Sequence, residues 1–206
     1  NAINNKDFFF NSIKDFLGTR ENFETIYYGM GPGSFTNIRR ILSFVKAIST
    51  VRNKNFLSAN NIIGVNNLAI LGFYYLTNYS LNKKDFILPI FENSKSLITQ
   101  LYKINHEINF PLEKASDIEI MFEEDIYSFL KRKNVKIENT NIICISKNEN
   151  FLIKKQKIKS FSKLYLGKTL YQIVNIIDNR IIKFEKYKDI FQNDLKPLYA
   201  KEPNTN

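Results

Sequence analysis

Gly29-Met30-Gly31-Pro32-Gly33-Ser34-Phe35-Thr36 is the stretch of this 206-residue sequence that decides the fold. It follows a β-rich run at residues 23–28 and precedes a helical pattern that begins at Ile38. Glycines at such a junction permit a sharp change of chain direction. The sequence therefore predicts a strand, a tight turn and a helix in that order.

The turn has two interpretations. Gly31 and Gly33 can take backbone angles that a Cβ forbids, and Pro32 fixes φ between them. Ser34 or Thr36 can cap the helix by accepting from its free N–H groups, which makes the helix start a candidate anion site. The simpler interpretation is that the glycines only permit a sharp turn and close helix–sheet packing. Neither recognised phosphate signature is present, because the Gly-Lys-Ser/Thr ending and the dinucleotide spacing are both missing.

Apolar periodicity predicts alternating helices and strands along the chain. Asn66 is a candidate N-cap for one of these helices. On the helix after the turn, one stripe that faces a sheet is formed by Ile38, Ile41, Leu42, Val45 and Ile48. The expected helices are residues 7–17, 37–51, 66–76, 118–133 and 161–177, and the expected strands are residues 23–28, 56–65, 86–91, 97–104 and 141–146. Residues 181–184 extend the last helix or form a strand.

Composition is that of a protein with a sizeable core. With 44% hydrophobic and 14% aromatic residues, the chain can form one compact domain or two small ones. A polar, lysine-rich segment at residues 81–85 separates two halves. We expect an N-terminal subdomain at residues 1–84, which holds the glycine turn, and a C-terminal subdomain at residues 85–206.

Several features favour a protein of the reducing cytoplasm. Cys144 is the single cysteine, so an internal disulfide is excluded. No apolar run is long enough to span a bilayer, because residues 60–75 are interrupted by glycines and asparagines. No charged leader followed by an apolar stretch is visible, so we expect no secretory signal and no membrane partner.

The net charge of +10 comes from 30 Lys and Arg residues against 20 Asp and Glu residues. A clustered basic face would neutralise phosphates, which makes a nucleic-acid-binding module one alternative function. The lysines are spread along the chain, however. Lys, Asn, Ile, Phe and Tyr all have A/T-rich codons, so the excess also fits an A/T-rich genome and a solvated surface.

Groups suited to catalysis are scarce. His106 is the single histidine, so neither a two-histidine metal site nor a His-Glu-x-x-His peptidase motif can be built within this sequence. Cys144 lies in an apolar strand pattern and is expected to be inert. Ser34 lacks the Gly-x-Ser-x-Gly context of a nucleophile elbow. The acidic residues 123–125 suit a helix start better than a carboxylate pair. We therefore expect no catalytic residue, metal or cofactor.

The glycine turn resembles the signature of the TsaB family, which takes part in the synthesis of threonylcarbamoyladenosine in tRNA. The family pattern reads roughly Gly-Arg-Gly-Pro-Gly-Ser-Phe-Thr-Gly-Leu-Arg-Ile-Gly. The residues that match in register are Gly29, Gly31, Pro32, Gly33, Ser34, Phe35, Thr36 and Arg39. Weaker similarities follow in the family's order at residues 45–47, 64–68 and 197–199.

The sequence also departs from the family pattern. Asn37, Ile41 and Ala47 stand where the family usually has glycine, and residues 92–94 match poorly, so the chain resembles a divergent member. The family opens with a strand and a hairpin, whereas residues 1–18 already have the pattern of the helix that follows them. We expect those strands to be missing from the sequence rather than lost from the protein.

The resemblance implies an actin-like, ribonuclease H-like α/β fold of two subdomains, with mixed sheets flanked by helices. It implies a non-catalytic dimerisation subunit that pairs with a TsaD-like catalytic sister subunit. Together with a TsaE-like ATPase, this pair would support threonylcarbamoyl transfer to an adenosine of tRNA. Two alternatives stay open: an independent ATP-binding enzyme of the actin-like superfamily, and the basic nucleic-acid-binding module.

The resemblance also implies a pairing surface. In the family this surface is a bundle of helices from each subunit, which here corresponds to residues 7–17 and 37–51. We expect Phe44 to point away from the sheet and toward the partner. The expected interface residues are Phe8, Phe9, Phe10, Ile13 and Phe44. Packing of all these side chains inside the subunit, and a homodimer of the isolated chain through the same helices, are the other outcomes left open.

Overall fold

The computed structural model describes residues 25–50, 61–79, 84–93, 96–105, 110–145, 152–153, 156–157, 159–161, 167–178 and 190–192. The helices are α2 (Phe35–Thr50), α3 (Asn67–Asn78), α4 (Ile126–Arg132) and α5 (Gly167–Asp178), with 3-10 helices η1 (Glu123–Asp125) and η2 (Ile137–Asn139). The strands are β1 (Thr25–Gly31), β2 (Asn61–Asn66), β3 (Phe86–Asn93), β4 (Ser96–Thr99), β5 (Tyr102–Ile104), β6 (Leu112–Lys114), β7 (Glu119–Met121), β8 (Thr140–Ile145), β9 (Leu152–Ile153), β10 (Gln156–Lys157), β11 (Lys159–Phe161) and β12 (Phe191–Gln192).

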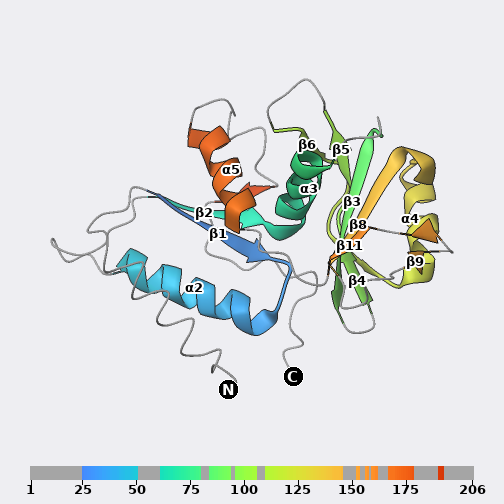
Figure 1. Cartoon of the computed structure of the whole chain (residues 1–206). Coiled ribbons are helices and arrows are strands. Elements are labelled where there is room, and N and C mark those ends of the chain that lie inside the picture. The colour runs from blue at the N-terminus through green and yellow to red at the C-terminus, as the bar shows by residue number, and fades with distance from the viewer. Residues whose placement is uncertain are drawn as a thin grey trace, which may run out of the picture.

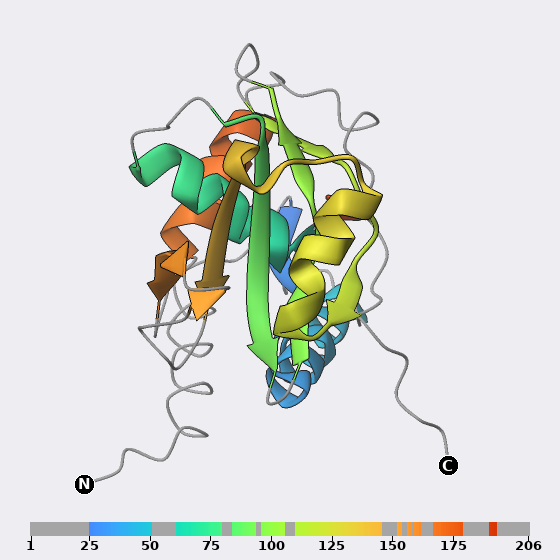
Figure 2. The same ribbon diagram turned by 90° about the vertical axis from the view of Figure 1, so that its right-hand side faces the viewer.

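These elements stack in layers (Figure 1). α2 covers one face of a three-stranded sheet with the order β1-β2-β12. α3 and α5 pack against each other, and α3 also contacts the second sheet. That sheet has seven strands, with β11-β8-β3-β4-β7 as its main order, and α4 covers its far face, as Figure 2 shows. The predicted mixed α/β fold with sheets flanked by helices is thus confirmed.

The first sheet contains both the first and the last strand that the structure describes, β1 and β12. β1 runs parallel to β2, and β12 runs antiparallel to β2 with Phe191 opposite Val65. The sheet therefore joins strands from near the start and the end of the sequence. The predicted boundary between residues 84 and 85 stays a prediction. No helix in the described segments is long and apolar enough to cross a membrane.

The predicted strand at residues 97–104 is two strands. β4 and β5 both pair antiparallel with β3, but Gln100 and Leu101 leave the ladder between them. The Leu101 carbonyl oxygen accepts from the N–H groups of Ala115 at 2.9 Å and Ser116 at 3.2 Å. Residues 115–116 therefore satisfy the Leu101 carbonyl oxygen between β4 and β5. An apolar sequence pattern alone does not reveal such a contact.

The predicted helix at residues 118–133 is wrong in its first half. β7 pairs antiparallel with β4, with Ile120 opposite Ile98. Ile120 is 42% exposed and Met121 is 7% exposed, which is the alternation of a strand. The helix α4 begins only at Ile126, after η1. The acidic residues 123–125 form η1, and Lys131 and Arg132 stand in the last turn of α4.

The predicted helix at residues 161–177 begins later than expected. Residues 159–161 form β11, which pairs in parallel with β8 so that Phe161 lies opposite Ile145. α5 starts at Gly167. Pairing with a neighbouring strand thus overrides the local helical pattern at Phe161.

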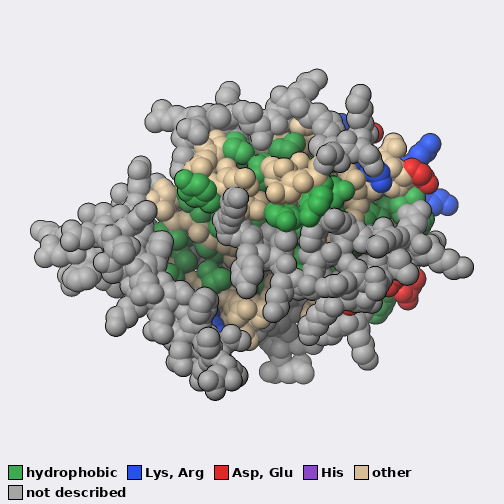
Figure 3. Space-filling view, viewed as in Figure 1, with side chains coloured by type: hydrophobic (Ala, Val, Ile, Leu, Met, Phe, Trp, Pro, Cys, Tyr) green, Lys and Arg blue, Asp and Glu red, His purple; other side chains and the backbone are tan. Residues whose placement is uncertain are grey.

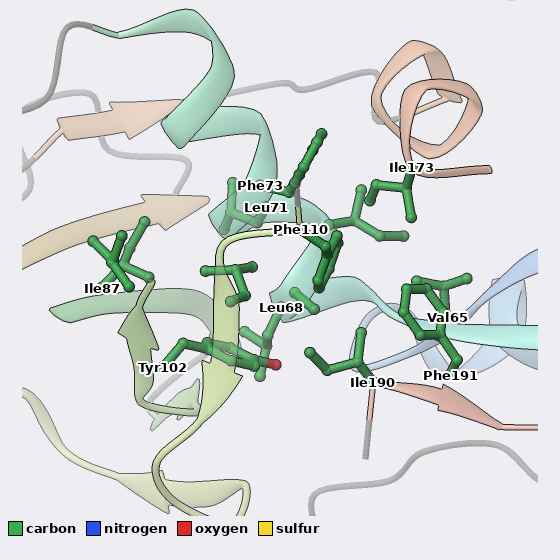
Figure 4. Packing of buried hydrophobic residues seen from close by; sticks show 14 of the residues in the cluster. Val65, Leu68, Leu71, Phe73, Ile87, Tyr102, Phe110, Ile173, Ile190 and Phe191 are labelled. Atoms are coloured by element: carbon green, nitrogen blue, oxygen red, sulfur yellow. The ribbon is translucent and has the colours of Figure 1, made fainter. Parts of the chain in front are cut away.

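A buried cluster joins the two sheets (Figure 4). The Phe110 ring stacks on Phe73 of α3 with a centroid distance of 5.4 Å, and it lies 5.4 Å from the ring of Phe191 in β12. Ile87 and Tyr102 of the second sheet belong to the same cluster. The two sheets are therefore held by one continuous apolar core around α3.

Candidate functional site

The candidate site lies at the edge where β1 and β2 end. The strands are parallel, with Gly29 opposite Val65 and Gly31 opposite Asn66. α3 follows β2 directly, and α2 follows β1 after the glycine turn, so both helices begin at this edge. In α/β folds this edge is where ligands and recognition residues are commonly placed. The structure thus brings the glycine turn together with residues 64–68, the second region of family similarity.

Asn67, the first residue of α3, holds the glycine turn. Its Nδ2 donates to the carbonyl oxygen of Pro32 at 3.0 Å. Its Oδ1 lies so close to Gly29 that a Cβ at this position would collide with it. Glycine at position 29 therefore allows the Asn67 amide to approach the backbone closely, and a larger residue would force this side chain to shift. Sequence reasoning marked residues 64–68 by similarity but gave Asn67 no role, because a contact over this separation leaves no periodic signal.

The other two glycines of the turn differ from each other. Gly31 has a φ of 117°, in the region that side chains with a Cβ rarely adopt. Gly33 is exposed and lies outside that region, and a Cβ there would meet its nearest neighbours at 3.6 and 3.8 Å, which is ordinary contact. The prediction of restricted backbone angles is confirmed for Gly31 and wrong for Gly33.

This difference predicts unequal effects of alanine. Gly31→Ala should lower the free energy of unfolding by about 1–3 kcal/mol, because the side chain would hold a strained φ. Gly33→Ala should change it by no more than about 0.5 kcal/mol. Urea denaturation followed by circular dichroism measures both. Equal destabilisation by the two substitutions would contradict the assignment of strain to Gly31.

The remaining signature residues form the start of α2. The carbonyl oxygen of Ser34 accepts from the Ile38 N–H at 2.9 Å, and Phe35 is the first residue of the helix. Thr36 and Arg39 are exposed on it. The stripe that packs on the first sheet consists of Ile38, Leu42 and Val45, with Ile41 half-buried beside it. The predicted sheet-facing stripe is confirmed at these positions.

The prediction that Phe44 points away from the sheet is wrong. It is half-buried and packs against the same cluster, which also contains Tyr28 and Met30 of β1. Phe44 lies three residues after Ile41, so it sits on the flank of the apolar stripe. Its contact with a partner stays a prediction, and a charge at Phe44 would disturb this packing as well. The other expected interface residues, Phe8, Phe9, Phe10 and Ile13, lie outside the described residues.

Asn66 connects the site to the second sheet. Its Oδ1 accepts from the Leu68 N–H at 2.9 Å, which confirms the predicted N-cap. Its Nδ2 donates to Gln100 Oε1 at 2.7 Å, and the same oxygen accepts from the Tyr102 hydroxyl at 2.6 Å. Gln100 Nε2 donates to the Ser116 carbonyl oxygen at 2.9 Å. All these groups but the Leu68 amide form a buried polar network centred on Gln100, which sequence reasoning missed.

The remaining titratable candidates from the sequence are His106 and the acidic run at residues 123–125. In the described segments, no group of three or more His, Cys, Asp or Glu side chains could hold a metal ion. His106 lies outside the described residues. Asp125 Oδ2 accepts from the Phe122 N–H at 3.2 Å, so the acidic run at residues 123–125 serves as a helix start, as predicted.

Cys144 is fully buried in β8, as predicted for a core residue. Burial raises the pKa of its thiol to about 12, and the charges of Glu92 and Glu123 contribute to the rise. Because the thiolate is the reactive form, the native protein should not react with Ellman's reagent at mildly alkaline pH. The denatured protein should react fully. A fast reaction of the native protein would show that β8 is accessible.

Comparison with known proteins places the architecture in context. No family model and no curated protein matches the chain. Among solved structures, YeaZ from Pseudomonas aeruginosa is similar over 85% of this chain and 73% of its own, with a TM-score of 0.54 and 12% sequence identity. The chain shares the fold of YeaZ. YeaZ is a TsaB protein with an actin-like fold, so the predicted actin-like class is confirmed, and at this identity the likeness extends to the fold alone.

Proposed function

We propose that the chain is a non-catalytic, TsaB-type subunit of the complex that synthesises threonylcarbamoyladenosine in tRNA, acting in the cytoplasm. It pairs with a TsaD-like catalytic sister subunit, and a TsaE-like ATPase joins the pair. The observation that carries this proposal is the glycine turn. Its TsaB-like sequence occupies a strand-to-helix turn in a YeaZ-like fold and is held by Asn67 from the second region of similarity.

The contacts of the turn support a structural role for it. The Asn67 side chain lies against Gly29, and its Nδ2 donates to the Pro32 carbonyl oxygen. The Asn67 amide thus donates to the backbone of the turn, and this contact supports a turn that sets the start of α2.

The exposed face of α2 supports pairing through polar contacts. Thr36, Ser43 and Lys46 are exposed, while the apolar stripe of this helix is used against the first sheet. In this proposal α2 supplies polar contacts to the sister subunit. The predicted helix at residues 7–17, outside the described residues, supplies the aromatic ones.

Reconstitution tests the proposed function. The chain is mixed with the TsaD-like and TsaE-like proteins of its own organism and with tRNA, and the modified nucleoside is measured by mass spectrometry. Product should form with the chain present and fall to background without it. Product that forms equally without the chain would overturn the proposal. ATP hydrolysis by the isolated chain that a point substitution abolishes would favour the ATP-binding enzyme instead.

A charge on the exposed face of α2 should weaken the pairing. Ser43→Glu is expected to raise the dissociation constant for the sister subunit at least tenfold, or about 1.4 kcal/mol. The thermal midpoint should not change, because Ser43 is exposed. Asn93→Glu makes the same change at an exposed end of β3 and serves as the control. Calorimetric titration measures both, and full affinity of Ser43→Glu would exclude the middle of α2 from the interface.

A further inference from the structure

A pocket of about 490 Å³ lies at the end of α4, far along the chain from the glycine turn. Its floor is apolar and includes Leu130 and Val135, both buried. Its rim carries Tyr127 and two lysines, Lys131 and Lys136. Figure 3 shows charged side chains gathered at the end of the molecule where α4 lies. Neither the proposed pairing surface nor the glycine turn uses this pocket.

The local backbone explains why the two lysines share one pocket. Asn134 has a φ of 55° and ends α4 in the left-handed conformation. The Asn134 N–H donates to the Lys131 carbonyl oxygen at 3.0 Å, and the Val135 N–H donates to that of Leu130 at 2.9 Å. This is the Schellman ending of a helix, in which the chain turns back over the last turn. The reversal brings Lys136 to the same pocket as Lys131.

The neighbouring cations are engaged elsewhere. Arg132 and Lys133 lie 3.7 and 3.6 Å from the carboxylate oxygens of Glu119, and Lys133 also lies over the Phe129 ring. Lys131 and Lys136 are exposed and form no ion pair with any described residue. Lys131 also complements the negative end of α4, but Lys136 lies beyond that helix and has no such role.

We propose that this pocket binds a segment of RNA, with a phosphate between Lys131 and Lys136 and a base against the Tyr127 ring. Tyr127 and Lys131 are four residues apart on α4, so both project from the same side of the helix. Proteins that bind single-stranded nucleic acid combine cationic side chains, which contact the phosphates, with aromatic rings on which the bases stack. The pocket has the volume that a nucleotide-sized group requires.

RNA fits this pocket better than an acidic peptide does. A peptide carboxylate would satisfy the lysines but would bring no planar group to the apolar lining of the pocket. A nucleotide supplies both a charge and a planar base. The inference deepens the proposed function, on which it rests, because it assigns to this chain a direct contact with the tRNA that the complex modifies.

The test uses the full chain, alone and with its sister subunit, and a fluorescein-labelled tRNA transcript. The double variant Lys131→Glu and Lys136→Glu should weaken binding at least tenfold and lower the slope of log K against log salt by about 0.7, since the site holds one phosphate and each neutralised phosphate contributes about 0.7 on single strands. Tyr127→Leu keeps an apolar side chain against the floor and should weaken binding about fivefold or more with little change in slope.

The control is Lys103→Glu with Lys114→Glu, which makes the same change in net charge on β5 and β6, where Lys114 forms an ion pair with Asp117 at 2.8 Å. Thermal midpoints confirm that each variant folds. An unchanged tRNA affinity of the Lys131 and Lys136 variant, or a loss no larger than in the control, would overturn the proposal. Competition by poly-glutamate as effective as that by unlabelled RNA would overturn it in favour of an acidic peptide.

Pairing with the sister subunit is measured separately by calorimetry, so that the two proposals fail independently. Normal pairing together with unchanged RNA binding by the Lys131 and Lys136 variant would overturn the RNA site alone. If the wild-type chain binds RNA but does not pair with the sister subunit, and the Lys131 and Lys136 variant loses RNA binding, the RNA site is supported and the proposed function is contradicted.

Discussion

Replacing Gln100 by leucine is expected to lower the free energy of unfolding by about 3 kcal/mol or more. Gln100 is 3% exposed and is the centre of the buried network that includes Asn66, Tyr102 and Ser116. Leucine has a similar size but leaves one amide donor, one hydroxyl and one carbonyl oxygen without their partner. Each buried group left unpaired costs about 1–3 kcal/mol. Guanidinium denaturation followed by circular dichroism measures the change.

The neighbouring residue gives a matched control. The hydroxyl of Thr99 is also buried and donates to the Pro89 carbonyl oxygen at 2.8 Å. Thr99→Val removes this bond at constant size and should cost about 1 kcal/mol. A Gln100→Leu protein no less stable than Thr99→Val would show that the network does not join the start of α3 to the second sheet.

Elements with a local cause were predicted well from the sequence. The glycine turn, the apolar stripe of α2 and the Asn66 cap depend on residues within about one or two helical turns of each other. The fold class followed from the alternation of such elements. The actin-like architecture came from the resemblance of the turn, which the likeness to YeaZ then confirmed at the level of the fold.

Features that depend on distant partners were missed or wrong. The segment that forms β7 was predicted to be helical because its acidic neighbours and the basic residues at the end of α4 suit a helix dipole. Its pairing with β4, which lies far from it in the local pattern, makes it a strand. Phe44 was placed on the wrong side because the width of the apolar face of α2 depends on the sheet beneath it. Asn67 and Gln100 act through contacts over more than 30 residues, which no local pattern reports.

Phe110→Ala is expected to lower the free energy of unfolding by about 3–5 kcal/mol, because it removes a large buried side chain that leaves a cavity. Phe110 is 1% exposed, and its ring lies between Phe73 of α3 and Phe191 of β12. It precedes β6 of the second sheet, so its loss affects the core that both sheets share. Tyr171→Ala, at a side chain that is 66% exposed on α5, should change stability by no more than about 0.5 kcal/mol.

The same variant tests whether the two predicted subdomains unfold separately. Far-ultraviolet circular dichroism and tyrosine fluorescence should give one coincident transition for the wild-type chain, since a shared core makes unfolding cooperative. Phe110→Ala should shift that whole transition to lower denaturant. Two separate transitions, with only one shifted, would contradict a shared core. A single shifted transition would mean that the segments on either side of the predicted boundary between residues 84 and 85 unfold as one unit, so that the glycine turn and the pocket at α4 are lost together.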